Sequence, residues 1–332
     1  MISRLASRTV ANRLLLSHVS VCRVPEPMEQ RRNFTNETVV GFWKTLSHST
    51  PVAYVQEGLL NIHDYSGLPW WATIVLSTFL FRTAVTLPLA IYSTRITSKI
   101  ENLTLEMPAL VKELKAETAF GIRKYKWTEK KARMIYNRSV KKQWDALIVR
   151  DNCHPAKTLI LLWGQIPLWI FQSAAIRNLV HLQPDPTSIQ AQIAFTELTV
   201  GGFGWIPNLT DVDHSFILPV ALGLINLSII QLQVWMRSER PSGKVQKIAT
   251  NFFRVFSVAM IPISSMVPSV LCVYWVSSST YGLLQNLLIA SPKVRRLVGI
   301  PKTKSELEAP YSHLSNIITT KLGLGNGKIK QV

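Results

Sequence analysis

Charged residues are scarce in this chain. They make up 17% of its 332 residues, whereas soluble domains carry about 25%. Hydrophobic residues account for 47% of the chain, and they gather in long runs. The pattern predicts an all-α protein that crosses a membrane several times, because helices satisfy their own backbone hydrogen bonds in lipid.

Cysteine is almost absent, and so are the motifs of catalysis. Cys22, Cys153 and Cys272 lie far apart and form no CxxC pair, which argues against a disulfide framework or a zinc site. The chain has no HExxH, GxSxG, P-loop or GxGxxG, and no histidine lies in an apolar segment where it could serve as a base. We therefore predict no enzyme, no metal and no cofactor. The net charge of +18 is attributed to membrane topology, and no nucleic-acid partner is predicted.

Acidic residues are missing from every long apolar segment. We predict five membrane spans, at residues 67–92, 156–180, 216–236, 252–267 and 269–290. The first span begins near Trp70 and Trp71 and ends near Tyr92, which is typical of membrane interfaces. It also contains Arg82, roughly 15 Å from Tyr92 along a helix.

An arginine near the middle of a membrane costs at least about 2.5 kcal/mol on insertion scales. Arg82 therefore needs polar or wet surroundings, yet no carboxylate lies in any predicted span. Intramembrane ionisable residues are functional by default; the alternative is that Arg82 only holds helices together. Pro88 frees the carbonyl of Ala84, so we also expect a kink in this helix.

Lysine and arginine are absent from residues 181–214, which carry four acidic residues. Residues 93–154 carry 14 basic and 7 acidic residues, the loop 237–251 is basic, and the tail 291–332 has 8 basic and 2 acidic residues. Basic loops stay on the side from which the chain is inserted. Five spans place all three basic regions on that side, which is the matrix in a mitochondrion. The N-terminus then faces the intermembrane space and the C-terminus the matrix.

The regions outside the spans have separate predicted roles. Residues 1–32 are rich in arginine and serine and poor in acid, as in a mitochondrial presequence. Residues 33–66 form an intermembrane-space segment with an amphipathic helix that starts at Thr50-Pro51. Residues 93–154 form a helical hairpin on the matrix side, with Gly121 in its break. This hairpin either contacts clients or merely connects two spans.

Polar residues recur seven positions apart in the later spans, as Gln165/Gln172, Asn226/Gln233, Ser257/Ser264 and Ser278/Gln285. Seven residues are two helical turns, so each pair shares a helix face. These faces either converge on a polar groove around Arg82 or bond helices together, at about 0.6 kcal/mol for each bond. The unpaired arginine favours a groove. Its predicted client-binding residues are Arg82, Gln165, Gln172, Asn226, Gln233, Ser278 and Gln285.

The arrangement resembles the YidC/Oxa/Albino membrane insertase family: an arginine in the first span, a charged hairpin, then four spans close together. The matching stretches are Asn152–Pro155, Gln165–Pro167, Trp205–Thr210, Ile217–Pro219 and VPSVLCVYWVSSSTYGLLQNLL from Val267. The last stretch is the most specific. Together they cover about residues 50 to 295.

The resemblance implies an insertase of the mitochondrial inner membrane with a hydrophilic groove that contains Arg82 and opens to the matrix. The short tail makes the chain most similar to the cytochrome c oxidase assembly branch. That branch exports the polar C-terminal domain of oxidase subunit 2, which would be the client, with membrane lipid and other complex IV assembly factors as partners. The alternatives are a general inner-membrane insertase and an assembly scaffold that moves nothing.

Overall fold

The computed structural model describes residues 41, 43–236 and 243–321. The chain divides into two units, Met1–Leu46 and Ser47–Val332, and every helix from α3 onward belongs to the second. The predicted presequence lies outside the described residues. Within the described part, all elements are helices, apart from two isolated bridges.

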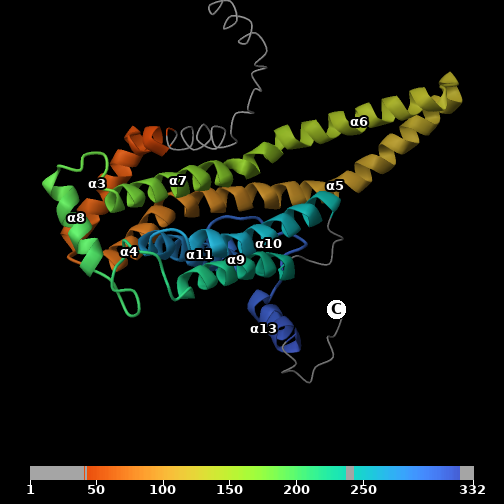
Figure 1. Ribbon diagram of the computed structural model, residues 1–332. Coiled ribbons are helices and arrows are strands. Elements are labelled where there is room, and N and C mark those ends of the chain that lie inside the picture. Colours follow the sequence, from red (N-terminus) through yellow and green to blue (C-terminus); the bar gives the residue numbers. More distant parts are fainter. Residues whose placement is uncertain (1–40, 42, 237–242, 322–332) are drawn as a thin grey trace, which may run out of the picture. The chain divides into compact units, whose positions relative to one another are not determined.

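The helices are shown in Figure 1. Their bounds are α3 Thr50–Ser66, α4 Trp70–Phe81, η1 Arg82–Thr86, α5 Leu87–Tyr125, α6 Glu129–Arg150, η2 Pro155–Leu159, α7 Ile160–Val180, α8 Ile189–Val200, α9 Ile217–Trp235, α10 Lys244–Ser264, α11 Ser269–Ala290, α12 Pro292–Leu297 and α13 Pro310–Lys321.

Three helical stretches are long and apolar enough to cross a membrane: Trp70–Tyr125, Pro155–Val180 and Ile217–Trp235. The helices α10 and α11 have the length but are more polar, because α10 starts with basic residues and α11 carries serines, tyrosines and amides. An all-helical membrane protein is therefore confirmed, and the arrangement with five spans stays a prediction.

The helix α3 begins at Thr50, as predicted, with Pro51 in its first turn. Proline suits this position because its missing N–H has no intrahelical partner there. Val52 and Leu59 are fully buried, and α3 packs against α7. The helix ends at Gly67, whose φ of 61° lies in the left-handed region that glycine adopts without steric cost.

A wide turn interrupts the first predicted span where a kink was expected. The residues Arg82–Thr86 form a π-helical turn, in which the Leu87 N–H bonds to the Arg82 carbonyl. Pro88 has no N–H for the carbonyl of Ala84, and one turn with bonds to the fifth residue back accommodates this loss. Such turns frequently mark functional positions in helices.

The helices α5 and α6 pack side by side, joined by a short connection (Figure 1). Their core contains Ile96, Leu103, Leu147 and Cys153. The expected break at Gly121 is wrong, because α5 continues to Tyr125. Gly121 is needed for packing: a Cβ atom there would lie 2.5 Å from the Trp127 ring.

The helix α9 packs against both α10 and α11. The helix α10 begins at Lys244, eight residues before the predicted span, and ends at Ser264. A tight connection leads into α11 at Pro268. The N–H groups of Ser269 and Val270 donate to the carbonyls of Asp211 and Leu209, at 2.6 and 3.0 Å, so the loop before α9 holds the start of α11.

Short helices also lie in two regions for which no helix is predicted from the sequence. The helix α8 lies in the acidic segment 181–214, and α12 and α13 lie in the basic tail. The side chain of Glu197 on α8 accepts a hydrogen bond from Trp70 Nε1 at 2.9 Å and binds His63 Nε2 at 3.0 Å. The helix α8 is thus fastened to the start of the first span.

Candidate functional site

Arg82 is the first residue of the wide turn, and its side chain points into the protein. The residue is only 6% exposed, and its Nη2 donates a hydrogen bond to Ser278 Oγ on α11. The phenol groups of Tyr274 and Tyr281 are its electrostatic neighbours. Arg82 has no carboxylate partner among the described residues, so neutral groups hold its charge.

Tyr281 lies one turn beyond Ser278 on the same face of α11. Its hydroxyl shares a hydrogen bond of 3.0 Å with Thr83 Oγ1. Its ring meets Phe79 edge to face, with 5.2 Å between centroids. The wide turn is therefore bonded to α11 at two neighbouring positions, through Arg82 and Thr83.

The helix α7 reaches the same region through Gln172, which is fully buried. Gln172 Nε2 donates to Thr78 Oγ1 at 3.3 Å, and Thr78 lies one turn before Arg82. The Oε1 atom of Gln172 is buried without a hydrogen-bond partner in the described part of the chain. An unpaired buried acceptor is costly, so this position favours a water molecule or a polar ligand group.

Two more of the predicted client-binding residues lie together, away from Arg82. Gln233 and Gln285 line a cavity of about 430 Å³ that is bounded by α5, α7, α9, α11 and the tail. Arg295 and Glu306 belong to its wall. Since Gln285 and Ser278 are two turns apart on one face of α11, roughly 10 Å separates the cavity from the Ser278 level.

The other two predicted client-binding residues, Asn226 and Gln165, belong to neither of these groups. Asn226 accepts a hydrogen bond of 2.8 Å from Ser279, so it bonds α9 to α11. Gln165 is half-buried and forms no hydrogen bond to the other six predicted residues in the described structure. The seven residues therefore form two groups and two separate positions, and no single wall contains all of them.

Sequence reasoning missed three residues that contact the predicted ones. Thr78, Thr83 and Tyr281 all bond within the polar cluster. The helical spacing could have indicated two of them, since Thr78 lies four residues before Arg82 and Tyr281 three residues after Ser278. Each of these side chains carries a hydroxyl group, and a search restricted to amide and charged groups does not select it.

No group of three or more potential metal ligands among His, Cys, Asp and Glu occurs in the described part. The cluster around Arg82 instead offers one cation, several hydroxyls and an unused amide oxygen. Such a site can bind polar or acidic peptide segments by charge and hydrogen bonding.

Several known proteins that are similar to this chain are mitochondrial. It is 42% identical over 283 residues to the mouse (Mus musculus) cytochrome c oxidase assembly protein COX18, mitochondrial, covering 85% of this chain and 83% of that protein. Identity to the human (Homo sapiens) protein of the same name is 41%, over the same shares. The mitochondrial inner membrane protein OXA1 of Arabidopsis thaliana is 26% identical over 76% of this chain and 52% of its own length.

The family described as 60Kd inner membrane protein matches residues 61–296. This range contains the Arg82 cluster, the α5–α6 pair and every helix from α7 to α11. The chain therefore belongs to the 60Kd inner membrane protein family, the YidC/Oxa family of membrane insertases.

Proposed function

We propose that this protein is an insertase of the mitochondrial inner membrane that serves the assembly of cytochrome c oxidase. It moves polar segments from the matrix to the intermembrane space, and its client is the C-terminal domain of oxidase subunit 2. The observation that carries the proposal is Arg82, a cation buried among membrane helices and held by neutral groups alone. Its uncompensated charge attracts polar and acidic segments that must cross.

The family and the names of the relatives support this proposal. The mouse and human relatives are named for cytochrome c oxidase assembly, and the Arabidopsis relative for the mitochondrial inner membrane. In this proposal the protein has five spans, with the N-terminus in the intermembrane space. The α5–α6 pair and the tail lie in the matrix, where the basic segments belong.

The proposed path for a client runs from the cavity at Gln233 and Gln285 to the polar cluster at Arg82. The α11 face that carries Gln285, Tyr281 and Ser278 connects the two. A client segment on this path loses its contacts with water and gains contacts with hydroxyls, amides and one positive charge. This lowers the cost of polar groups that would otherwise enter hydrocarbon.

The decisive experiment depletes the protein from mitochondria and asks on which side of the inner membrane the subunit 2 tail lies. In mitoplasts, added protease should cut the exported tail in the parent and spare it after depletion. A photo-crosslinker at Gln233 should capture subunit 2 during export, whereas one at Trp163, which is 78% exposed on α7, serves as the control.

An assembly scaffold that moves nothing is the alternative. It predicts crosslinks to finished subunits only, and a correctly exported tail after depletion. A general insertase predicts that many mitochondrially encoded proteins lose insertion together. The same mitoplasts test the orientation: protease should spare the tail of this protein and cut within 181–214.

A further inference from the structure

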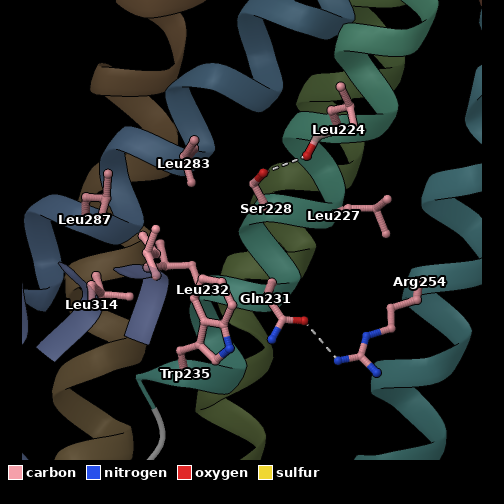
Figure 2. A pocket seen from close by; sticks show the side chains of 11 residues that line it. Leu224, Leu227, Ser228, Gln231, Leu232, Trp235, Arg254, Leu283, Leu287 and Leu314 are labelled. Atoms are coloured by element: carbon pink, nitrogen blue, oxygen red, sulfur yellow. Dashed lines mark hydrogen bonds between the residues drawn. The ribbon is translucent and has the colours of Figure 1, made fainter. Parts of the chain in front are cut away.

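A second cavity lies away from the Arg82 cluster, between α9, α10, α11 and α13 (Figure 2). Its volume is about 530 Å³, within the range of roughly 300–1,000 Å³ that is typical of ligand sites. It is lined by Leu224, Leu227, Ser228, Gln231, Leu232, Trp235, Arg254, Leu283, Leu287, Leu314 and Ile318.

Apolar side chains line the cavity along its length, and polar side chains add to its wall toward one end. Its α9 residues follow one face of the helix from Leu224 to Trp235, roughly 16 Å at 1.5 Å per residue. This is about half of a hydrocarbon core of about 30 Å, or one leaflet. Leucines line the whole length, and Gln231, Trp235 and Arg254 join them toward one end, where Leu232 and Leu314 also lie (Figure 2).

The polar end carries positive charge and an unused donor. Arg254 Nη2 donates to Gln231 Oε1 at 3.2 Å, and no carboxylate in the described part of the chain pairs with Arg254. The Nε1 atom of Trp235 is buried and has no hydrogen-bond partner there. The Lys321 ammonium lies 5.4 Å from the centre of the Trp235 ring. Arg254 and the Trp235 N–H therefore belong to the cavity wall, with Lys321 against the Trp235 ring, and this positive charge complements an anion.

The tail helix α13 completes this cavity. Tyr311 Oη donates to the carbonyl of Leu287 at 3.0 Å, which holds α13 against α11. Leu314 and Ile318 then form part of the apolar wall, and Lys321 at the end of α13 lies at the polar end. The polar end also adjoins the basic segment 237–251 along the chain, as expected of the end of a span at a membrane surface.

We propose that this cavity binds an anionic phospholipid, with one acyl chain along the leucines and the phosphate at Arg254, Trp235 and Lys321. Basic pockets between membrane helices on the matrix side suit such headgroups. The cations beside an apolar wall favour an acyl chain with an anionic headgroup over an apolar client helix, which carries no charge to pair with them. The proposal of a lipid site does not rest on the proposed translocation activity.

The test uses the full-length chain, purified in detergent and incubated with phosphatidylglycerol or phosphatidylcholine. Native mass spectrometry counts the lipid that stays bound. The parent should retain phosphatidylglycerol in preference to phosphatidylcholine. Arg254→Ala should lower phosphatidylglycerol retention about fivefold, the usual effect of one basic residue near an anionic lipid, and Arg254→Lys should retain most of it.

Two further variants separate the parts of the site. Trp235→Phe keeps the ring beneath Lys321 and removes only the N–H donor, so it should weaken retention of phosphatidylglycerol and leave that of phosphatidylcholine unchanged. Leu227→Trp fills the cavity without changing any charge, and it should abolish retention. Arg138→Ala, an exposed arginine on α6, is the matched charge control and should behave as the parent. Gel filtration of each variant shows that the protein stays folded.

Three results would overturn the proposal. The first is equal retention of the two lipids by the parent. The second is an Arg254→Ala variant that binds phosphatidylglycerol as Arg138→Ala does. The third is unchanged retention by a folded Leu227→Trp variant, because the chain would then lie elsewhere. A photo-crosslinker at Leu227 that captures a protein segment instead of lipid would make the cavity a client site and also reject the lipid.

Discussion

Two largely buried arginines in this protein have opposite surroundings. Arg82, in the first span, donates to the neutral hydroxyl of Ser278 and has no carboxylate partner in the described part. Arg295, just after α11, donates to Ser98 Oγ at 2.9 Å and lies 3.9 Å from the carboxylate of Glu306. Removal from water lowers the pKa of Arg295, and Glu306 opposes this shift.

The comparison distinguishes Arg295, whose charge is paired with a carboxylate within the structure, from Arg82, whose charge has no counter-charge among the described residues. Glu306 has only 5% of its side chain exposed, and it pairs with both Arg295 and Arg296. Glu306 therefore offsets part of the positive charge within the tail, and the bonds of Arg295 to Ser98 and of Ser305 Oγ to Glu101, the latter at 2.7 Å, fasten the tail to α5. At Arg82 no carboxylate of the described chain cancels the positive charge, so its electrostatic attraction can act on a polar segment nearby.

Removing the Arg82 charge should have the largest effect. Arg82→Ala should lower export of the subunit 2 tail about tenfold or more, because even a third of a Coulomb term of about 4 kcal/mol at 4 Å corresponds to that factor. The protein itself should accumulate normally, since a buried charge has been removed. Protease protection of the tail in mitoplasts and oxidase activity are the measurements.

Arg82→Lys is the control for charge, and it should retain much of the export although it loses the guanidinium fork. Normal export by a stable Arg82→Ala protein would contradict the role given to this residue. The groove would then lose its main support.

Giving Arg82 a carboxylate would make it resemble Arg295. Ser278→Asp places an acid at the atom that Arg82 already contacts. The variant should insert and accumulate, because the new ion pair is internally neutral. Export should fall about fivefold, or roughly 1 kcal/mol, because the field has been cancelled.

Ser278→Ala separates the loss of the hydroxyl from the gain of the carboxylate, and its export should lie nearer to the parent value. If Ser278→Asp exports as well as the parent, the free charge has no role in translocation. The comparison between the two arginines would then describe stability alone.

Breaking the tail cluster should affect structure more than export. Glu306→Gln leaves Arg295 and Arg296 without a carboxylate, which costs about 1–3 kcal/mol of local stability. Limited proteolysis of the purified protein should cut between α12 and α13 sooner than in the parent. Glu308→Gln, at an exposed position, should leave the cleavage rate unchanged. A loss of export as large as that of Arg82→Ala would assign the tail a direct role.

The smallest effect is expected at the exposed ion pairs of α6. The Arg150 side chain, about half exposed, lies 3.1 Å from Glu106 and 2.9 Å from Asp151. Its hydrogen bond lowers the pKa of Asp151, so this contribution is present above the ordinary carboxylate range and is lost as the pH falls through the lowered pKa. Arg150→Gln should leave the thermal unfolding temperature unchanged near neutral pH. A large drop would show that exposed pairs also hold the α5–α6 pair together.

Composition and periodicity alone determined much of this protein. Low charge and long apolar runs indicated the all-helical membrane class, and the Thr50-Pro51 pair indicated the start of α3. The position of Arg82 among apolar residues showed that it needed polar neighbours. These features are local, because a helix face and a helix start depend on residues within a few turns.

Only the tertiary structure decided which faces meet. Seven-residue spacing placed Ser278 and Gln285 on one face, but it could not show that one contacts Arg82 and the other lines a separate cavity. The expected break at Gly121 failed because Trp127, six residues later, folds back over it. A helix face is fixed by neighbours in the chain, whereas its partner is fixed by packing among helices distant in sequence, where side-chain shape and the need to pair buried polar groups choose the contact.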